Sequence, residues 1–411
     1  MSTTPSTRSE ALAPLRFRPF RWLVLGATIN RLGSSIAPLA LAFAVLDFTH
    51  SAADLGIVVG SRSLANLVFL LLGGALADRL PRGLVLAGSS TASALTQAAV
   101  ALVLLGHANS VPLLAGLSAL NGAVAAISGP ASAGLIPLTV PREVLKPANA
   151  LSRLFSNGAS VAGTAAAGLL VATLGSGAAI AADAGTYAAA AVCFALLRLN
   201  AARPVRTETL LRALSAGWNA FASRSWVWAT VAAASVANAV FVGGIVVLGP
   251  ALADKTIGRS AWGIFLAAQT LGYVAGGILA MRIRIRRMLT FGILCCTAWA
   301  LPLFALAAHS PLPVLLAASF LGGVGVELFG VAWATSLQEQ IPLAVLSRVS
   351  SYDQLGSFLA IPLGQVLAGP ISAALGQTPT LAAGGGLLVL ALGATLCLPS
   401  VRHLETSRRS E

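Results

Sequence analysis

The sequence predicts an all-α membrane protein with twelve transmembrane helices in two pseudo-symmetric six-helix halves. Three observations predict this fold. The 411 residues are 57% hydrophobic and 9% charged, with a mean hydropathy of +0.85, which is too apolar for a soluble domain. The apolar residues form twelve runs, each close to the ~20 residues that cross a bilayer as a helix. Glycines and prolines recur at a fixed offset between the two halves of the chain.

The first half follows a polar and basic N-terminal tail at 1–20. We expect no cleavable signal peptide, because the first apolar run is too long for the hydrophobic region of one. The runs lack the alternation of barrel strands, so helices are expected throughout. Together they form the predicted N-terminal half, 21–198, with spans at 21–46, 52–77, 84–106, 111–136, 149–173 and 178–198.

The second half begins after the longest polar stretch, 199–225, which is predicted to be a cytoplasmic linker. The predicted C-terminal half is 226–400, and a tail at 401–411 follows it. Its predicted spans lie at 226–250, 261–281, 288–308, 313–336, 352–373 and 381–400.

The distribution of basic residues predicts the orientation in the membrane. If the N-terminus is cytoplasmic, 21 of the 26 Lys and Arg residues fall in cytoplasmic segments and three within spans, and only Lys255 and Arg259 lie outside the cell. Basic residues concentrate on the cytoplasmic side of membrane proteins. We therefore expect a multi-pass protein of the bacterial cytoplasmic membrane with both termini in the cytoplasm.

An internal repeat supports the division into halves. A shift of 201 positions superposes six features of the first half on the second. Two parallel halves related by an axis along the membrane normal are a transporter architecture. The superposed pairs are Gly122 and Gly323, Gly129 and Gly330, Pro141 and Pro342, Gly163 and Gly364, Gly168 and Gly369, and Leu174-Gly175 and Leu375-Gly376.

The turn after the second span carries a recognisable motif. Residues 73–83 read Gly-Gly-Ala-Leu-Ala-Asp-Arg-Leu-Pro-Arg-Gly. This turn resembles the loop G-x-x-x-D-R-x-G-R-[RK] between helices 2 and 3 of the major facilitator superfamily. Gly74, Asp78, Arg79 and Arg82 match that motif, whereas Pro81 replaces a glycine and Gly83 replaces the final basic residue.

The wider sequence is similar to the branch of drug and siderophore exporters called transmembrane secretion effectors. The resemblance is carried by residues 15–21, 136–143 and 337–342. It implies the major facilitator fold and a conformational latch formed by the matching residues Gly74, Asp78, Arg79 and Arg82. The antiporter signature G-P-x-x-G-G is only partly kept at 163–168, where the proline is missing.

Four charged residues lie well inside predicted spans, away from the helix ends, namely Arg31, Arg62, Asp183 and Glu327. Each costs roughly 2.5–3.5 kcal/mol or more at midspan unless it is paired or hydrated. We expect Arg31 and Glu327 to face each other across a central cavity, with Glu327 as the proton-coupling group, or else to form a static buried pair. For Arg62 and Asp183 a structural link between helices 2 and 6 is favoured.

The substrate is expected to contact polar and aromatic groups near midspan on the cavity helices. A mostly apolar wall with a few amides suits a small amphipathic organic molecule better than a sugar. Asp353, close to a cytoplasmic helix end, is assigned no function. The candidate cavity residues are Asn30, Asn121, Asn238, Phe241, Phe329 and Trp333.

Several other functions are excluded. The basic residues form no patch with interleaved aromatics, which argues against nucleic-acid binding despite a net charge of +13. The four cysteines and four histidines lack the spacing of a metal site, and no phosphate-binding loop is present. We therefore expect no cofactor and no enzymatic activity, with the proton gradient as the energy source.

The function predicted from these observations is proton-coupled efflux of an antibiotic, toxic metabolite or siderophore by alternating access. The expected partners are the small substrate, protons and the lipid bilayer, and the chain is expected to act as a monomer. Two alternatives remain at this point. One is a nutrient or metabolite importer on the same fold, and the other is a membrane scaffold or sensor that transports nothing.

Overall fold

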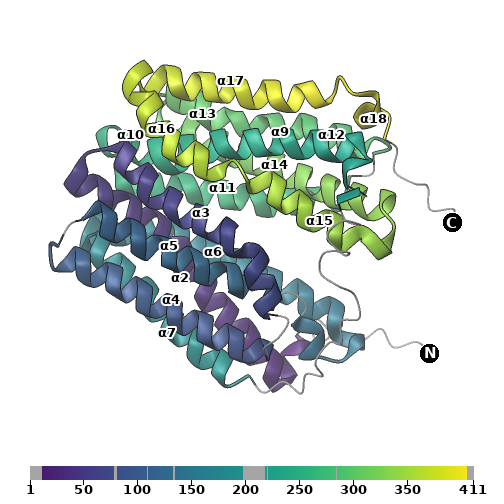
Figure 1. The fold of residues 1–411 in the computed structure, drawn as a ribbon, viewed down its shortest axis with the longest axis horizontal. Helices are drawn as coiled ribbons and strands as arrows, with labels where there is room; N and C mark the ends of the chain where they lie inside the picture. Colours follow the sequence, from purple (N-terminus) through teal and green to yellow (C-terminus); the bar gives the residue numbers. More distant parts are fainter. Residues whose placement is uncertain are drawn as a thin grey trace. The chain divides into compact units, whose positions relative to one another are not determined.

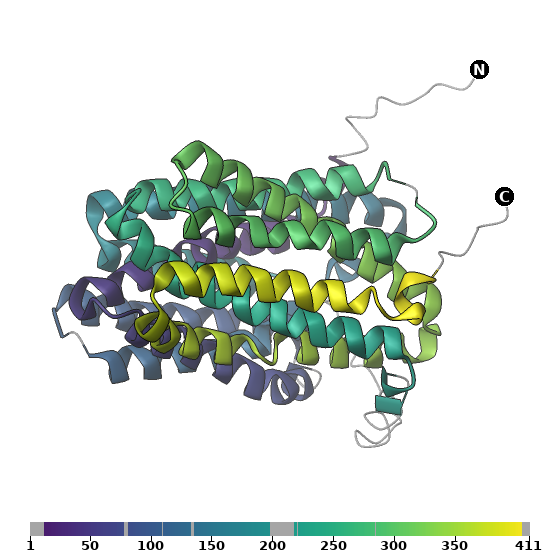
Figure 2. The same ribbon diagram turned by 90° about the horizontal axis from the view of Figure 1, so that it is seen from above.

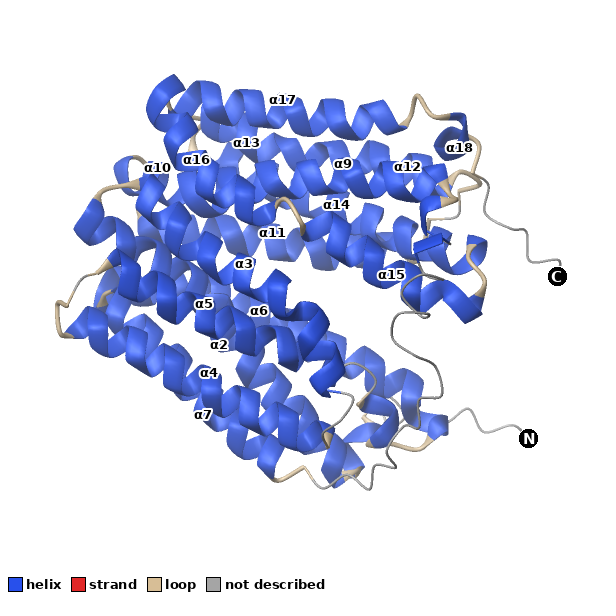
Figure 3. Cartoon of the chain, viewed as in Figure 1, coloured by secondary structure: helices blue, strands red, loops and turns tan. Residues whose placement is uncertain are grey.

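The computed structural model describes residues 12–77, 81–108, 110–132, 135–197, 218–219, 221–283 and 285–404. Over these residues the chain is helical and contains no strand (Figure 3). Twelve helical segments are long and apolar enough to cross a membrane. The predicted all-α fold with twelve spans is therefore confirmed.

The chain packs into two compact units. The first comprises 1–49 and 61–205, and the second comprises 50–60 and 206–411, so the N-terminal part of α3 groups with the second unit. The long helices of the first half are α2 (Arg18–Thr49), α3 (Ala52–Ala77), α4 (Arg82–Leu105), α5 (Val111–Ser132), α6 (Leu145–Leu174) and α7 (Ser176–Ala195), coloured purple to teal in Figure 1. Short 3₁₀ helices lie at Ala13–Arg16, Ile136–Leu138 and Arg142–Val144.

Three spans of the second half are interrupted. The seventh changes from α9 (Ser225–Val242) to a π-helix at Gly243–Leu248 and then to α10 (Gly249–Lys255). The ninth consists of α12 (Met288–Cys296), a 3₁₀ turn at Thr297–Ala300 and α13 (Leu301–Ala307). The eleventh is divided into α15 (Leu343–Phe358) and α16 (Ile361–Leu375).

The remaining spans of the second half are continuous. They are α11 (Arg259–Ala280), α14 (Leu312–Gln340) and α17 (Gln377–Thr395), and the short α18 (Pro399–Arg402) follows. In Figures 1 and 2, α17 (yellow) runs beside α9 (teal), and these two helices are in contact.

The two units repeat one packing pattern. In the first, α2 packs on α6 and α7, and α4 packs on α5 and α7. In the second, α9 packs on α15, α16 and α17, while α12 contacts α14 and α13 contacts α17. Numbered by span, these are the same helix pairs in each half, which is the pseudo-symmetry that the sequence repeat predicts.

Repeated glycines lie at equivalent helix crossings. A Cβ at Gly163 in α6 would collide with the carbonyl oxygen of Leu32 in α2, and one at Gly364 in α16 would collide with that of Ala239 in α9. Both crossings join the first and fifth spans of a half. Glycine has no Cβ, so it lets two helix backbones approach closely where lipid supplies no driving force for association.

The helix turns are repeated too. Gly175 and Gly376 precede α7 and α17 with φ values of 83° and 90°. Only glycine adopts this backbone conformation without a steric cost. The Leu-Gly pairs of the sequence repeat therefore mark the same tight turn in both halves.

Candidate functional site

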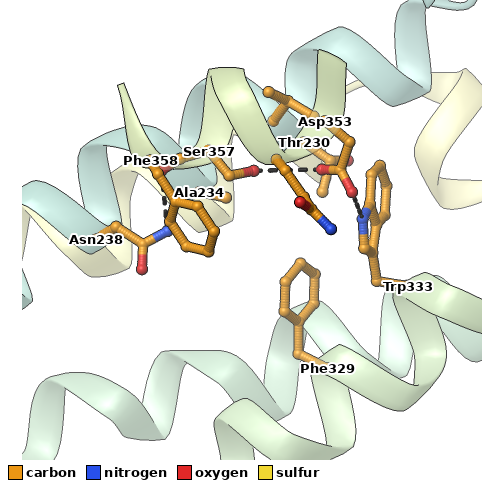
Figure 4. Close-up of a pocket in the computed structure, with 10 residues that line it drawn as sticks. Thr230, Ala234, Asn238, Phe329, Trp333, Asp353, Ser357 and Phe358 are labelled. Atoms are coloured by element: carbon orange, nitrogen blue, oxygen red, sulfur yellow. Dashed lines mark hydrogen bonds between the residues drawn. The ribbon is translucent and has the colours of Figure 1, made fainter. Parts of the chain in front are cut away.

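A cavity of about 190 Å³ lies in the second unit, between α9, α14 and α15 (Figure 4). Its walls follow helical spacing, since residues four apart share one face of a helix. Three such faces converge here, and Asp353 is the single charged residue of the lining. The lining residues are Thr230, Val231, Ala234 and Asn238 of α9, Phe329 and Trp333 of α14, and Asp353, Gln354, Ser357 and Phe358 of α15.

The Asp353 carboxylate is held by two neutral donors. Trp333 Nε1 donates to Asp353 Oδ2 over 2.9 Å, and Ser357 Oγ donates to Oδ1 over 3.2 Å. Each carboxylate oxygen has two lone pairs, so each keeps capacity for a further donor. The arrangement fixes the carboxyl group at the cavity wall, and neither donor carries a positive charge.

Aromatic rings form much of the remaining wall. The rings of Phe329 and Trp333 are stacked with centroids 6.3 Å apart, and Trp226 packs edge-on against Trp333 at 5.6 Å. Trp226 is buried behind this wall against Trp333, whereas Phe358, which lines the cavity, is exposed. Figure 4 shows the ring of Phe329 pointing towards the space between Asp353 and Phe358.

The cavity lies next to the break in the eleventh span. Pro362 has no N–H to donate to the carbonyl of Phe358, so the helix cannot continue regularly through this point. Asn238 Nδ2 of α9 donates to the carbonyl oxygen of Ser357 over 3.1 Å, which ties α9 to the end of α15. Broken transmembrane helices commonly form the binding sites of transporters.

The structure brings three of the six predicted cavity residues together at this cavity, namely Asn238, Phe329 and Trp333. Phe241 does not line it. Its side chain is buried and stacks on Trp299 with ring centroids 4.0 Å apart.

Two further cavity candidates lie in the first unit. Asn121 is buried, and its Nδ2 donates to Thr96 Oγ1 over 3.0 Å, which joins α5 to α4. Asn30 is half-buried and accepts a hydrogen bond from Ser34 Oγ through its Oδ1. Ser34 Oγ lies 3.0 Å from the hydroxyl of Tyr187 in α7, so Asn30 belongs to a polar chain that joins α2 and α7.

Asp183 and Arg62 lie close enough to interact electrostatically. The Asp183 side chain is fully buried and accepts a 2.6 Å hydrogen bond from Gln97 Nε2 of α4. Gly33 of α2 makes room for it, because a Cβ there would collide with Asp183 and Thr186. This cluster joins four helices of the first unit.

Glu327 of α14 is half-buried and lies over two glycines of α11. A Cβ at Gly276 would come within 2.9 Å of Glu327 Cβ, and one at Gly277 would lie 3.7 Å from Oε1. Arg31 is exposed in α2 of the first unit. The predicted pairing involves one residue from each unit, and it stays a prediction.

The predicted latch falls largely outside the described residues. Asp78 and Arg79 lie at 78–80, which are not among the described residues. Gly74 is in α3, and Arg82 is the first residue of α4, although its side chain is not among those described. The latch therefore stays a prediction.

Sequence reasoning missed Asp353. The predicted span 352–373 places Asp353 at a helix end, where a charge is inexpensive, whereas in the structure α15 begins at Leu343 and the carboxyl group bonds to Trp333 of another helix. The available signal was the spacing of Asp353 and Ser357, which places a hydroxyl one turn from the carboxylate. No group of three or more His, Cys, Asp or Glu side chains is placed for metal binding within the described chain.

Comparisons with known proteins agree with this architecture. The sequence is 28% identical over 415 residues to the multidrug efflux pump Tap of Mycolicibacterium fortuitum, covering 95% of this chain and 98% of Tap. It is 27% identical over 413 residues to the enterobactin exporter EntS of Escherichia coli K12, covering 95% of each chain. A bacterial homologue of the human lysosomal transporter Spinster has the same fold, with a TM-score of 0.73 at 14% identity over 94% of this chain and 97% of the homologue.

A family profile identifies the chain directly. The profile of the Major Facilitator Superfamily matches residues 23–364, which include the spans from the first into the eleventh. Together with the twelve apolar helices, the match indicates a multi-pass membrane transporter and not an enzyme. The chain belongs to the major facilitator superfamily.

Proposed function

We propose that this protein is a secondary active exporter. It carries a small amphipathic organic compound, such as an antibiotic, a toxic metabolite or a siderophore, out of the bacterial cell by alternating access. The observation that carries the proposal is the cavity wall of aromatic, apolar and a few polar side chains, a composition that suits such a compound. Export as the direction is supported by two relatives of nearly full length that are named an efflux pump and an exporter.

Energy comes from the proton gradient, with Glu327 as the group that takes up the proton. Its support is the position of the carboxyl group within a span, where an ionised carboxylate costs several kcal/mol unless it is paired or hydrated. The glycines at 276 and 277 leave space beside the side chain, which a larger residue would fill. In this proposal Arg31 meets Glu327 when the cavity is in one of its two accessible states.

The other charged residues singled out in the sequence have supporting roles. Arg62 and Asp183 hold the first unit together through their electrostatic contact. The turn that contains Asp78, Arg79 and Arg82 acts as a cytoplasmic latch that opens on rocking, with both termini on the same side. If Asp78→Asn leaves transport and the ratio of inward to outward states unchanged, the turn serves topology alone. A single copy of the chain is sufficient for this cycle.

Export is tested by accumulation. Cells with and without the gene are loaded with a panel of antibiotics, dyes and siderophores, and each is measured with and without an uncoupler. If cells with the gene accumulate less of a compound than cells without it, and the uncoupler abolishes this difference, the result supports energy-driven export. Failure of the deleted cells to grow on one nutrient would instead indicate an importer. If vesicles that contain the protein show no substrate-dependent flux, the protein is a scaffold or sensor and not a transporter.

Proton coupling is tested with Glu327→Gln in proteoliposomes with an imposed pH gradient. The expected result is loss of gradient-driven ethidium transport. Glu339→Gln is the matched control, because it makes the same change on an exposed part of the same helix. Undiminished gradient-driven transport by Glu327→Gln would remove this residue from the mechanism.

A further inference from the structure

We propose that the cavity between α9, α14 and α15 is a binding site for the cationic head of a monovalent organic cation, with Asp353 as its counter-charge and Phe329, Trp333 and Phe358 as its aromatic wall. This inference rests on the proposed transport function and narrows its substrate to amphipathic compounds that carry one positive charge.

The charged group in the cavity wall favours a cationic ligand. Asp353 is the single charged residue among the ten that line it. The donors Trp333 and Ser357 are neutral, so neither places a positive charge beside the carboxylate. A carboxylate inside a span is costly, and a ligand cation that approaches it offsets that cost. One carboxylate matches one positive charge.

The aromatic side chains of the cavity wall favour the same kind of ligand. An ammonium group is attracted to the face of an aromatic ring within about 6 Å, most strongly when water is excluded. Three aromatic side chains of α14 and α15 line the cavity together with the carboxylate. Trp333 turns its N–H edge to Asp353, which fixes the orientation of its ring relative to the carboxylate.

The volume of the cavity limits the size of the group that it can hold. Engineered cavities near 150 Å³ hold one benzene ring. The volume of about 190 Å³ therefore suits a substituted ammonium group with one ring, and not a large polycation. The exposed Phe358 lies at the wall where the rest of an amphipathic molecule would extend from the cavity.

The test uses two probes of equal shape, phenyltrimethylammonium and tert-butylbenzene, in which a carbon replaces the charged nitrogen. Binding to the purified full-length protein in detergent is measured by calorimetry, with a blank titration into empty micelles. The wild type should bind the cation about tenfold or more tightly than the neutral probe. Equal affinities of the wild type for the two probes would overturn the proposal.

Asp353→Asn keeps the acceptor for Trp333 and removes the charge. It should abolish the preference for the cation and leave tert-butylbenzene binding within about twofold. Asp254→Asn is the matched control, because it removes the same charge from an exposed pair with Arg259 in the same unit. If Asp353→Asn binds phenyltrimethylammonium as the wild type does, Asp353 only ties α15 to α14 and the proposal is wrong.

A second variant keeps the test valid if Asp353→Asn does not fold. Phe329→Leu keeps an apolar side chain and removes a ring face, so it should weaken binding of the cation several-fold more than binding of tert-butylbenzene. Equal weakening of both probes would contradict a cation site. Flux of phenyltrimethylammonium is measured separately in vesicles: binding without flux would count against the proposed export function and leave the binding site standing.

Discussion

Gln97 of α4 donates a 2.6 Å hydrogen bond to Oδ2 of Asp183 in α7, whose side chain is fully buried. The same carboxylate interacts electrostatically with Arg62 of α3. Thr186, one turn along α7, contributes a longer hydrogen bond of 3.4 Å to Oδ1. A buried carboxylate with these polar partners connects α7 to α4 and α3, in addition to its contact with Gly33 of α2.

Asp183→Ala should therefore destabilise the protein by about 1–3 kcal/mol, because it leaves the buried amide of Gln97 without its acceptor. Asp183→Asn should cost less, since the amide oxygen can still accept that hydrogen bond. The measurement is the midpoint of thermal unfolding in detergent. Asp254→Ala is the control, because an exposed ion pair contributes only about 0–1 kcal/mol. Equal midpoints for Asp183→Ala and Asp254→Ala would contradict a structural role for Asp183.

Gly163→Ala and Gly158→Ala should change stability in opposite directions, although both lie in α6. The Cβ added at Gly163 meets the backbone of α2 at Leu32, whereas a Cβ at Gly158 has no described atom within 4 Å beyond its own stretch of helix. Alanine favours a helix over glycine by up to about 1 kcal/mol, so Gly158→Ala should raise the unfolding midpoint. Gly163→Ala should lower it. A rise for both variants would show that α6 and α2 do not cross as closely as the structure has them.

The extent to which the sequence determines this fold is clearest at the repeated glycines. Gly163 and Gly364 were identified by their offset alone, and each lies where two helix backbones meet. Hydropathy similarly predicted all twelve spans, because a bilayer requires about twenty apolar residues to cross it. Both signals depend on position along the chain, which the sequence contains directly.

The sequence does not specify the rotation of each helix about its axis as directly. Phe241 and Asn121 are near midspan, as predicted, yet one stacks on Trp299 and the other bonds to Thr96. A uniformly apolar helix gives no sequence signal for which of its faces meets a neighbour. Pro362 does mark the break between α15 and α16, but the role of Asp353 depends on Trp333, which lies in a different helix.

Labelling of the native cysteines tests the orientation of the chain. Cys397 follows α17 and is exposed, whereas Cys193 and Cys296 are buried. A membrane-impermeant maleimide should label Cys397 in inside-out vesicles and not in intact cells, because the C-terminus is proposed to be cytoplasmic. Cys397→Ser should abolish this labelling. His309→Cys in that background, at the turn before α14, should react only from outside, and the reverse pattern would invert the topology.

Asn238→Ala should destabilise the protein by about 1 kcal/mol, because the Asn238 amide is the donor to the carbonyl of Ser357 at the end of α15. Loss of that bond also frees α15 to move relative to α9, so phenyltrimethylammonium should bind more weakly as well. Asn149→Ala is the matched control, because its amide donates to the carbonyl of Leu145 in its own exposed turn of α6. Alanine is the better helix former, so this control should be neutral or slightly stabilising. If the two variants unfold at the same temperature, the contact between Asn238 and Ser357 does not hold α9 to α15, and the cavity wall depends on the packing of Phe329 and Trp333 instead.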